Sequence, residues 1–292
     1  MEINIAKTSG FCFGVNRAVK IVDELLSKGE KVYTLGPIIH NPIVTENFKK
    51  RGAEIIEASL FIPQDAILVI RSHGVTKSKL EYIKFKNIKY IDATCPFVKK
   101  IHNIVTKESK DKNAVLLAAG DEKHPEMVGI RSYFDGKSYV FKNIFELKNL
   151  YKIIQNSCYK KIIMVAQTTF SIEEWKKCII FSKKVFTNIK IFDTICNTTD
   201  SRQKEADFLS KKSDLMIVIG GKNSSNTRKL YKICNNNTET IWVESVCNLV
   251  GKNFSKYEKI SIVAGASTPM GVINEIYEHI KSTVESVDCN LS

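Results

Sequence analysis

The chain of 292 residues predicts an α/β protein built from three similar small units, each with a mainly parallel sheet. Three observations lead to this fold class. Short apolar segments alternate with amphipathic segments along the whole chain, which is typical of strands and helices in α/β units. The strand candidates are nearly all apolar, as expected of sheets covered on both faces. One local pattern also occurs three times: a β-rich run, a small or polar break, a cysteine and a helix-like stretch.

Strands and helices can be assigned along the whole chain. Each predicted strand is a short apolar run, and the predicted helices between them carry apolar residues at the spacing of one helix face. The predicted strands are residues 1–8, 31–36, 66–72, 88–93, 114–120, 162–168, 189–194, 214–221, 240–245 and 259–267. The clearest predicted helices are residues 16–29, 95–110, 201–213 and 274–286. The cysteine pattern divides the chain into predicted units 1–95, 96–193 and 194–292.

Three of the eight cysteines occupy the repeated pattern, namely Cys12, Cys95 and Cys196. Each is predicted to lie where a strand ends and a helix begins, and at Cys95, directly before Pro96, the helix start favours the thiolate form. Three convergent thiolates are one short of the four that complete an iron–sulfur cubane or a structural zinc site, so a cluster held this way keeps one metal open. The other cysteines lack such a corner, and we predict that they pack as small apolar side chains. They are Cys158, Cys178, Cys234, Cys247 and Cys289.

The net charge of +13 indicates either an acidic partner or a compositional bias toward Lys, Asn and Ile. Only six of the 44 basic residues are Arg, and the lysines are scattered without aromatic residues between them. This argues against a dedicated nucleic-acid surface, and we expect no nucleic-acid partner. There is no apolar run of the length of a membrane helix and no signal-peptide pattern. We therefore expect no membrane partner and a cytoplasmic location with reduced or metal-bound thiols.

Histidines follow three predicted strands, close to Gly or Pro: His40, His73 and His124. Ligands of open α/β sheets bind at the carboxyl ends of strands, and three histidines at such positions indicate the cage of a charged ligand or a proton route. Glu126 lies near a predicted helix start, which lowers the pKa of a carboxyl group, whereas burial would raise that pKa. A catalytic role and a role as a helix-start carboxylate both stay open for Glu126.

The segment 220–226, GGKNSSN, lies between a predicted strand and a predicted helix. It contains no nucleotide-binding fingerprint, and taken alone it indicates simple capping of the helix by Ser or Asn. Backbone N–H groups at a helix start, together with hydroxyls and an amide, also form an anion cradle. Because Thr168, Ser267 and the three histidines occupy equivalent corners, the pattern favours a phosphate-type ligand.

The motifs together closely resemble the LytB/IspH family, the 4-hydroxy-3-methylbut-2-enyl diphosphate reductases. The segments that carry the resemblance run in order from residue 10 to residue 271: GFCFGVNRAV, GPIIHNP, SHGV, DATCPFV, HPE, QTTFS, the Cys196 segment, KNSSNT and AGASTP. They cover essentially the whole chain. The resemblance implies a three-lobed arrangement of the α/β units around a central iron–sulfur cluster.

The resemblance also implies roles for individual residues. Cys12, Cys95 and Cys196 would hold a [4Fe–4S] cluster with one open iron, and Glu126 would supply protons. The substrate, mainly its diphosphate, would be bound by His40, His73, His124, Thr168, Ser224, Ser225, Asn226 and Ser267. The implied state is a monomer or a weak dimer.

The implied reaction is a two-electron reductive dehydroxylation that forms isopentenyl and dimethylallyl diphosphate, the last step of the non-mevalonate isoprenoid pathway. The electrons would come from ferredoxin or flavodoxin, since the chain shows no flavin or nicotinamide motif. Two alternatives are a cluster-dependent dehydratase, which needs no electron donor, and a basic nucleic-acid-binding protein, which needs none of the three cysteines.

Overall fold

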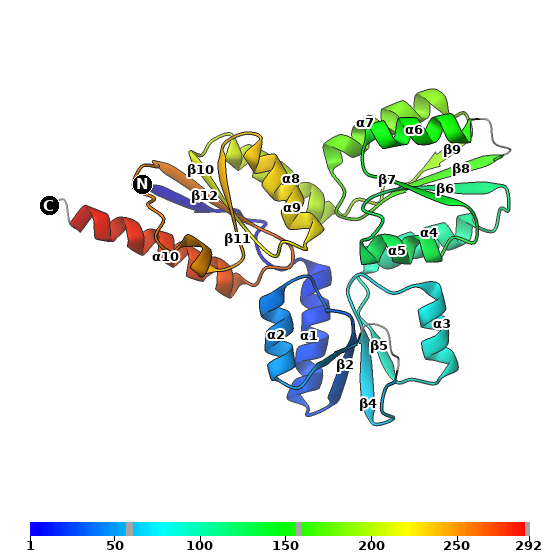
Figure 1. The fold of residues 1–292 in the computed structure, drawn as a ribbon, viewed down its shortest axis with the longest axis horizontal. Helices are drawn as coiled ribbons and strands as arrows, with labels where there is room; N and C mark the ends of the chain where they lie inside the picture. The colour runs from blue at the N-terminus through cyan, green and yellow to red at the C-terminus, as the bar shows by residue number, and fades with distance from the viewer. Residues whose placement is uncertain (57–60, 156–158, 290–292) are drawn as a thin grey trace. The chain divides into compact units, whose positions relative to one another are not determined.

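The computed structural model describes residues 1–56, 61–155 and 159–289. Within these ranges the strands form three four-stranded sheets in which every pair of neighbours is parallel (Figure 1). The predicted class of three similar α/β units with parallel sheets is thereby confirmed. No helix of the described ranges has the length and apolar character to cross a membrane.

The chain folds into two compact units, which we describe separately. The terminal unit consists of Met1–Asn16, His40–Glu46 and Asn197–Ser292. The central unit consists of Arg17–Ile39 and Asn47–Cys196. One sheet belongs to the terminal unit and two sheets belong to the central unit.

The sheet of the terminal unit has the order β1-β12-β10-β11. These strands are β1 (Glu2–Ile5), β10 (Leu215–Ile219), β11 (Glu239–Val243) and β12 (Lys259–Ala264). Its helices are α8 (Asn197–Ser210), α9 (Ser225–Asn235), the short 3-10 helix η1 (Val246–Leu249) and α10 (Met270–Cys289). Alternate residues of β10 pack on opposite faces: Ile217 lies in a core with α10, and Met216 lies in a core with α8 and α9. Burial on both faces explains why the strand reads as a continuous apolar run.

The first sheet of the central unit has the order β3-β2-β4-β5. These strands are β2 (Lys31–Leu35), β3 (Glu54–Ile56), β4 (Ala66–Ile70) and β5 (Tyr90–Asp92). α3 (Lys77–Phe85) belongs to this unit, whereas α1 (Phe13–Ser27) and α2 (Pro42–Lys50) each begin in the terminal unit and end in the central unit. α3 begins after Thr76, whose side chain accepts a hydrogen bond from the Lys79 N–H, and it packs Ile83 against β4.

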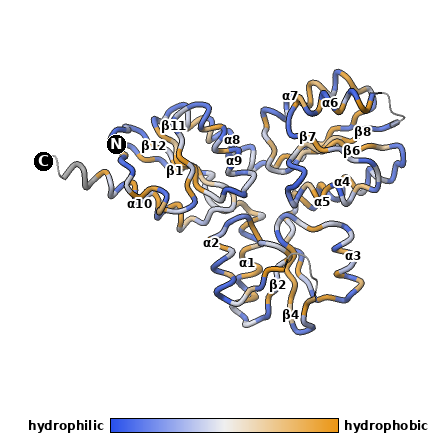
Figure 2. Tube along the Cα trace, viewed as in Figure 1, coloured by the Kyte–Doolittle hydropathy of each residue, from blue (hydrophilic) through white to orange (hydrophobic). Residues whose placement is uncertain are grey.

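The second sheet of the central unit has the order β7-β6-β8-β9. These strands are β6 (Ala114–Ala119), β7 (Ser138–Phe141), β8 (Lys161–Ala166) and β9 (Ile189–Ile191). One face packs on α4 (Pro96–Glu108) and α5 (Pro125–Ser132), and the other packs on α6 (Ile144–Ile154) and α7 (Ile172–Val185). In Figure 2 the apolar residues concentrate along the strands between these helices.

The three sheets share one topology, and the N-terminal strand completes the last of them. β1 occupies beside β12 the position that β5 has beside β4 and that β9 has beside β8. Residues 1–16 therefore belong with residues 197–292 and not with a first unit of residues 1–95. This correction to the predicted boundaries has a simple cause. The third unit has no fourth strand of its own after β12, because the chain continues as α10.

Candidate active site

The three repeated cysteines occupy equivalent corners in the three sheets. Each is the residue immediately before a helix, at the starts of α1, α4 and α8. Each also donates its backbone N–H to a carbonyl oxygen that lies two residues beyond the neighbouring strand. These bonds are Cys12 to Ala266 at 3.1 Å, Cys95 to Ser72 at 2.9 Å and Cys196 to Thr168 at 3.0 Å. The predicted strand-to-helix position of the three cysteines is confirmed, and the same hydrogen bond fixes all three corners.

The corner cysteines differ from the others in their surroundings. None of the three forms a disulfide, and all three residues are partly exposed. Cys178 and Cys234 are fully buried in α7 and α9, and this burial raises the pKa of each thiol to about 12, which disfavours the thiolate that binds metals. The predicted packing role is thus confirmed for these two and is wrong for Cys247, which is exposed. Cys158 and the side chain of Cys289 lie outside the described residues.

Glu126 is held in the central unit by Thr168. The carboxylate is buried, and it accepts the Thr168 N–H at Oε1 (2.6 Å) and the Thr168 hydroxyl at Oε2 (2.8 Å). Pro125 is the first residue of α5, as the sequence predicts, so Glu126 stands in the first turn of that helix. Glu126 follows β6 and Thr168 follows β8, and these strands are neighbours in one sheet. The sheet order therefore places a titratable carboxylate beside the corner that carries Cys196.

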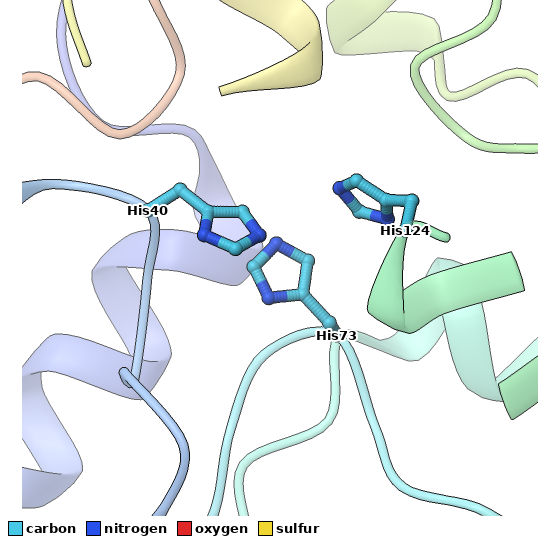
Figure 3. Close-up of side chains that lie close together, drawn as sticks. All are labelled: His40, His73 and His124. Atoms are coloured by element: carbon cyan, nitrogen blue, oxygen red, sulfur yellow. The ribbon is translucent and has the colours of Figure 1, made fainter. Parts of the chain in front are cut away.

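Two of the predicted histidines also lie together in the central unit. His73 follows β4, and His124 caps the start of α5 (Figure 3). Their rings meet edge to face with a centroid distance of 5.3 Å. The Nδ1 of His124 accepts the Glu126 N–H at 3.2 Å, so a proton on the neutral ring sits on Nε2. Nε2 is then the donor that His124 can offer to an anion.

The third histidine, also labelled in Figure 3, belongs to the terminal unit. The backbone oxygen of His40 accepts the Ser267 hydroxyl at 3.2 Å, and the Asn41 side-chain amide donates to the Ser267 carbonyl at 2.8 Å. A Cβ added to Gly221 would lie 3.1 Å from the same His40 oxygen. The terminal unit thus brings together the His40 loop, the Ser267 loop and the start of the GGKNSSN segment.

The start of α9 carries the remaining predicted ligands. Ser224 is the N-cap residue, and its side chain accepts the Thr227 N–H at 3.3 Å, so the capping role is present. Asn226 is only 4% exposed, and neither its amide nitrogen nor its amide oxygen has a hydrogen-bond partner within the described part of the chain. A buried amide without partners is costly, which makes Asn226 a candidate contact for a polar ligand. The capping role of Ser224 is confirmed, and ligand binding at this helix start stays a prediction.

Two residues that support the site were not assigned a role from the sequence. Asn41 accepts the Val44 N–H at 3.2 Å and holds the Ser267 loop, while the Ser72 hydroxyl donates to the Ile38 carbonyl at 3.0 Å beneath the Cys95 corner. The Asn41-Pro42 pair could have indicated that Asn41 stands immediately before a helix, because Pro is common at the first position of a helix. The sequence offers no comparable signal for Ser72.

The chain is similar to known proteins over nearly its whole length. Residues 3–281 match the LytB protein family. A 4-hydroxy-3-methylbut-2-enyl diphosphate reductase from Caldanaerobacter subterraneus subsp. tengcongensis is 42% identical over 97% of this chain and 97% of its own. The protein of the same name from Clostridioides difficile is 38% identical over 97% of this chain and 100% of its own.

Solved structures show the same relationship. The structure of the E-1-hydroxy-2-methyl-but-2-enyl-4-diphosphate reductase from Plasmodium falciparum matches with a TM-score of 0.86 and 29% identity, covering 95% of this chain and 87% of that one. A structure of (E)-4-hydroxy-3-methyl-but-2-enyl diphosphate reductase, described as the terminal enzyme of the non-mevalonate pathway, matches with a TM-score of 0.69 and 36% identity over 97% of this chain and 100% of that one. Matches of this extent in sequence and fold establish that the chain belongs to the LytB protein family.

Proposed function

We propose that this protein reduces 4-hydroxy-3-methylbut-2-enyl diphosphate to isopentenyl and dimethylallyl diphosphate. Its membership of the LytB family supports this reaction, and the observation that carries the assignment to named residues is the cysteine corner repeated in each sheet. The reaction consumes two electrons and two protons, breaks the carbon–oxygen bond of the allylic alcohol and releases water. It completes the non-mevalonate route to isoprenoids.

Cys12, Cys95 and Cys196 are the residues that would hold a [4Fe–4S] cluster. Their donor chemistry fits, because cysteine thiolates are the usual ligands of iron–sulfur clusters and the three residues are partly exposed and form no disulfide. When bound, such a cluster supplies electrons and, at an iron without a protein ligand, a Lewis-acid position. The two buried thiols in α7 and α9 do not fit this role, because burial raises their pKa.

The diphosphate would be bound by residues of the polar corners. Asn226 supports this part of the proposal, because its buried amide lacks a partner among the described residues. Ser225 is the first residue of α9, and a helix start offers N–H groups and a positive dipole end to phosphate oxygens. The remaining ligands of this proposal are His40, His73, His124, Thr168, Ser224 and Ser267. Holding both phosphates would position the alcohol carbon for reaction.

Glu126 would deliver a proton to the departing hydroxyl group. Thr168 fixes the direction of this carboxylate through two hydrogen bonds, and a positioned acid typically contributes 10²–10⁴-fold to a rate. Thr168 therefore has an observed role as the holder of Glu126, beside its proposed contact with the substrate. We assign the supply of electrons to ferredoxin or flavodoxin.

Turnover by the anaerobically reconstituted chain tests this function. With a reduced viologen dye we expect dye oxidation that depends on the substrate and yields both products. Glu126→Gln should lower kcat by about 10²-fold or more and leave the iron and sulfide content unchanged. Glu122→Gln is the matched control, because Glu122 is exposed and pairs with Arg131, and it should retain full activity. Consumption of the substrate without any reductant, with water added or removed and neither isopentenyl nor dimethylallyl diphosphate formed, would instead identify a dehydratase and overturn the proposal.

A further inference from the structure

A basic groove runs along α4 in the central unit. It has a volume of about 530 Å³, and the side chains that matter here are Arg17, Pro96, Lys99, Lys100, Asn103 and Lys107. We call it the α4 groove. Pro96, Lys100, Asn103 and Lys107 follow one another at steps of four, three and four residues, which places them on one face of the helix. All four are exposed, so the groove is open to a partner.

The α4 groove carries an excess of positive charge. Its only carboxylate is Asp92, which pairs with Lys99 at 2.7 Å. Arg17 donates to the backbone carbonyls of Asp92 (3.0 Å) and Thr94 (3.3 Å), and these neutral acceptors leave its charge uncompensated. Across the described ranges of the chain, Lys100 and Lys107 form no ion pair. Three cations therefore remain available to an acidic surface.

The groove also reaches one of the proposed cluster ligands. Pro96 lines it and is bonded directly to Cys95, and the Arg17 guanidinium holds the backbone that leads into Cys95. Phe97, the next residue of α4, is an apolar side chain that is 39% exposed. A protein that donates electrons has to bring its redox centre close to the cluster, and this surface lies beside a cluster ligand.

We propose that the α4 groove is the docking surface for an acidic electron-carrier protein. The inference rests on the proposed function and adds the place at which electrons enter. The face from Pro96 to Lys107 is about 16 Å long, which suits an extended acidic surface better than a single small anion. Complementary charges of this kind raise the association rate of transient redox partners and are weakened by salt.

The test replaces two lysines of the groove by acids in the full, reconstituted chain. With reduced ferredoxin or flavodoxin, Lys100→Glu together with Lys107→Glu should lower kcat/KM for the donor by about tenfold or more at low ionic strength. The loss should shrink as salt is added. The rate with a reduced viologen dye should not change, because the dye does not need the docking surface.

The control is Lys183→Glu together with Lys184→Glu. These exposed residues stand on α7, which covers the opposite face of the same sheet, and the pair makes the same change in net charge. Equal losses in the two double variants, or no loss in either, would overturn the docking surface. An RNA oligonucleotide that binds the wild type and not the groove variant, with an unchanged rate from the protein donor, would also overturn it. Absence of turnover with the dye in the wild type would instead refute the proposed function.

Discussion

His102 is a buried imidazole in the middle of α4. Its ring stacks on Tyr133 with a centroid distance of 4.2 Å, and it lies under the loop that follows β4. A Cβ added to Gly74 would come within 2.9 Å of His102 Cε1, and Gly74 has a positive φ of 75°. The close approach of this backbone to the ring therefore requires glycine. His102 thus packs α4, the helix that begins after Cys95, against the loop that carries His73.

Burial of His102 predicts a specific loss of stability in acid. Burial is the main cause that lowers its pKa from 6.5 to about 4. Between these values the unfolded chain binds a proton that the folded chain does not, so the free energy of unfolding falls as the pH is lowered from 6.5 toward 4. This one group accounts for a loss of about 3 kcal/mol across that window.

Denaturant unfolding at several pH values checks this prediction. His102→Gln removes the titrating ring. Between pH 6.5 and pH 4 the free energy of unfolding of the variant should therefore fall by about 3 kcal/mol less than that of the wild type. The two proteins are compared by how their free energies of unfolding change with pH and not by the values at one pH, because the substitution itself also disturbs packing. Parallel pH profiles for the two proteins would show that His102 is not held neutral by the fold.

At the scale of elements, Glu108 connects the end of α4 to two strands. Its buried carboxylate pairs with Lys161 of β8 at 2.6 Å and with Lys190 of β9 at 2.7 Å. Burial raises the pKa of Glu108, and the hydrogen bonds and charges of the two lysines lower it more, so the pKa lies below its ordinary value of 4.5. The ion pairs therefore stabilise the fold above that pH, and their contribution is lost as the pH falls through the lowered pKa.

Replacing Glu108 by Gln should destabilise the central unit by about 1–3 kcal/mol at neutral pH, because it removes the charge that pairs with both lysines. The difference from the wild type should diminish as the pH falls below 4.5 and through the lowered pKa of Glu108, because the wild-type carboxyl group then also becomes protonated. Chemical denaturation measures both effects. Glu173→Gln is the control, since Glu173 is 81% exposed in its pair with Lys177 and should change stability by less than about 0.5 kcal/mol. Equal effects of the two substitutions would contradict the prediction.

The elements that the sequence predicts best are the buried strands. β10 and β12 are continuous apolar runs because both of their faces are covered, and such runs are readable without any structure. β3 and β7 have only three and four residues and are largely part-exposed, so they lack the pattern that would predict them. The partner of β1 could not be predicted either, because β12 pairs with it from the other end of the chain.

In the site too, features set by neighbouring residues could be predicted from the sequence, and contacts between distant residues could not. The cysteine corners, Pro125 and the Ser224 cap are local patterns, and the structure confirms each of these positions. The bond between Glu126 and Thr168 joins residues 42 positions apart, and it depends on the order of β6 and β8 in the sheet. A single sequence does not show which strands are neighbours, so this contact became visible only in the folded chain.

At the scale of the whole molecule, three sheets of one topology each end in an equivalent cysteine corner. The identical hydrogen bond at Cys12, Cys95 and Cys196 shows that the repeat extends to the backbone geometry around each thiol. Completion of the last sheet by β1 is part of this repeat, because it gives the terminal unit the strand that leads into Cys12. We propose that these three thiols act together on one cluster.

Iron and sulfide analysis of single cysteine variants tests that claim most directly. We predict that Cys12→Ser, Cys95→Ser and Cys196→Ser each lose the cluster and with it turnover of 4-hydroxy-3-methylbut-2-enyl diphosphate, after the same anaerobic reconstitution. Cys247→Ser, at an exposed position in η1, should keep the iron, the sulfide and the rate of the wild type. Any one of the three corner variants that retained the full cluster and the full rate would contradict the account.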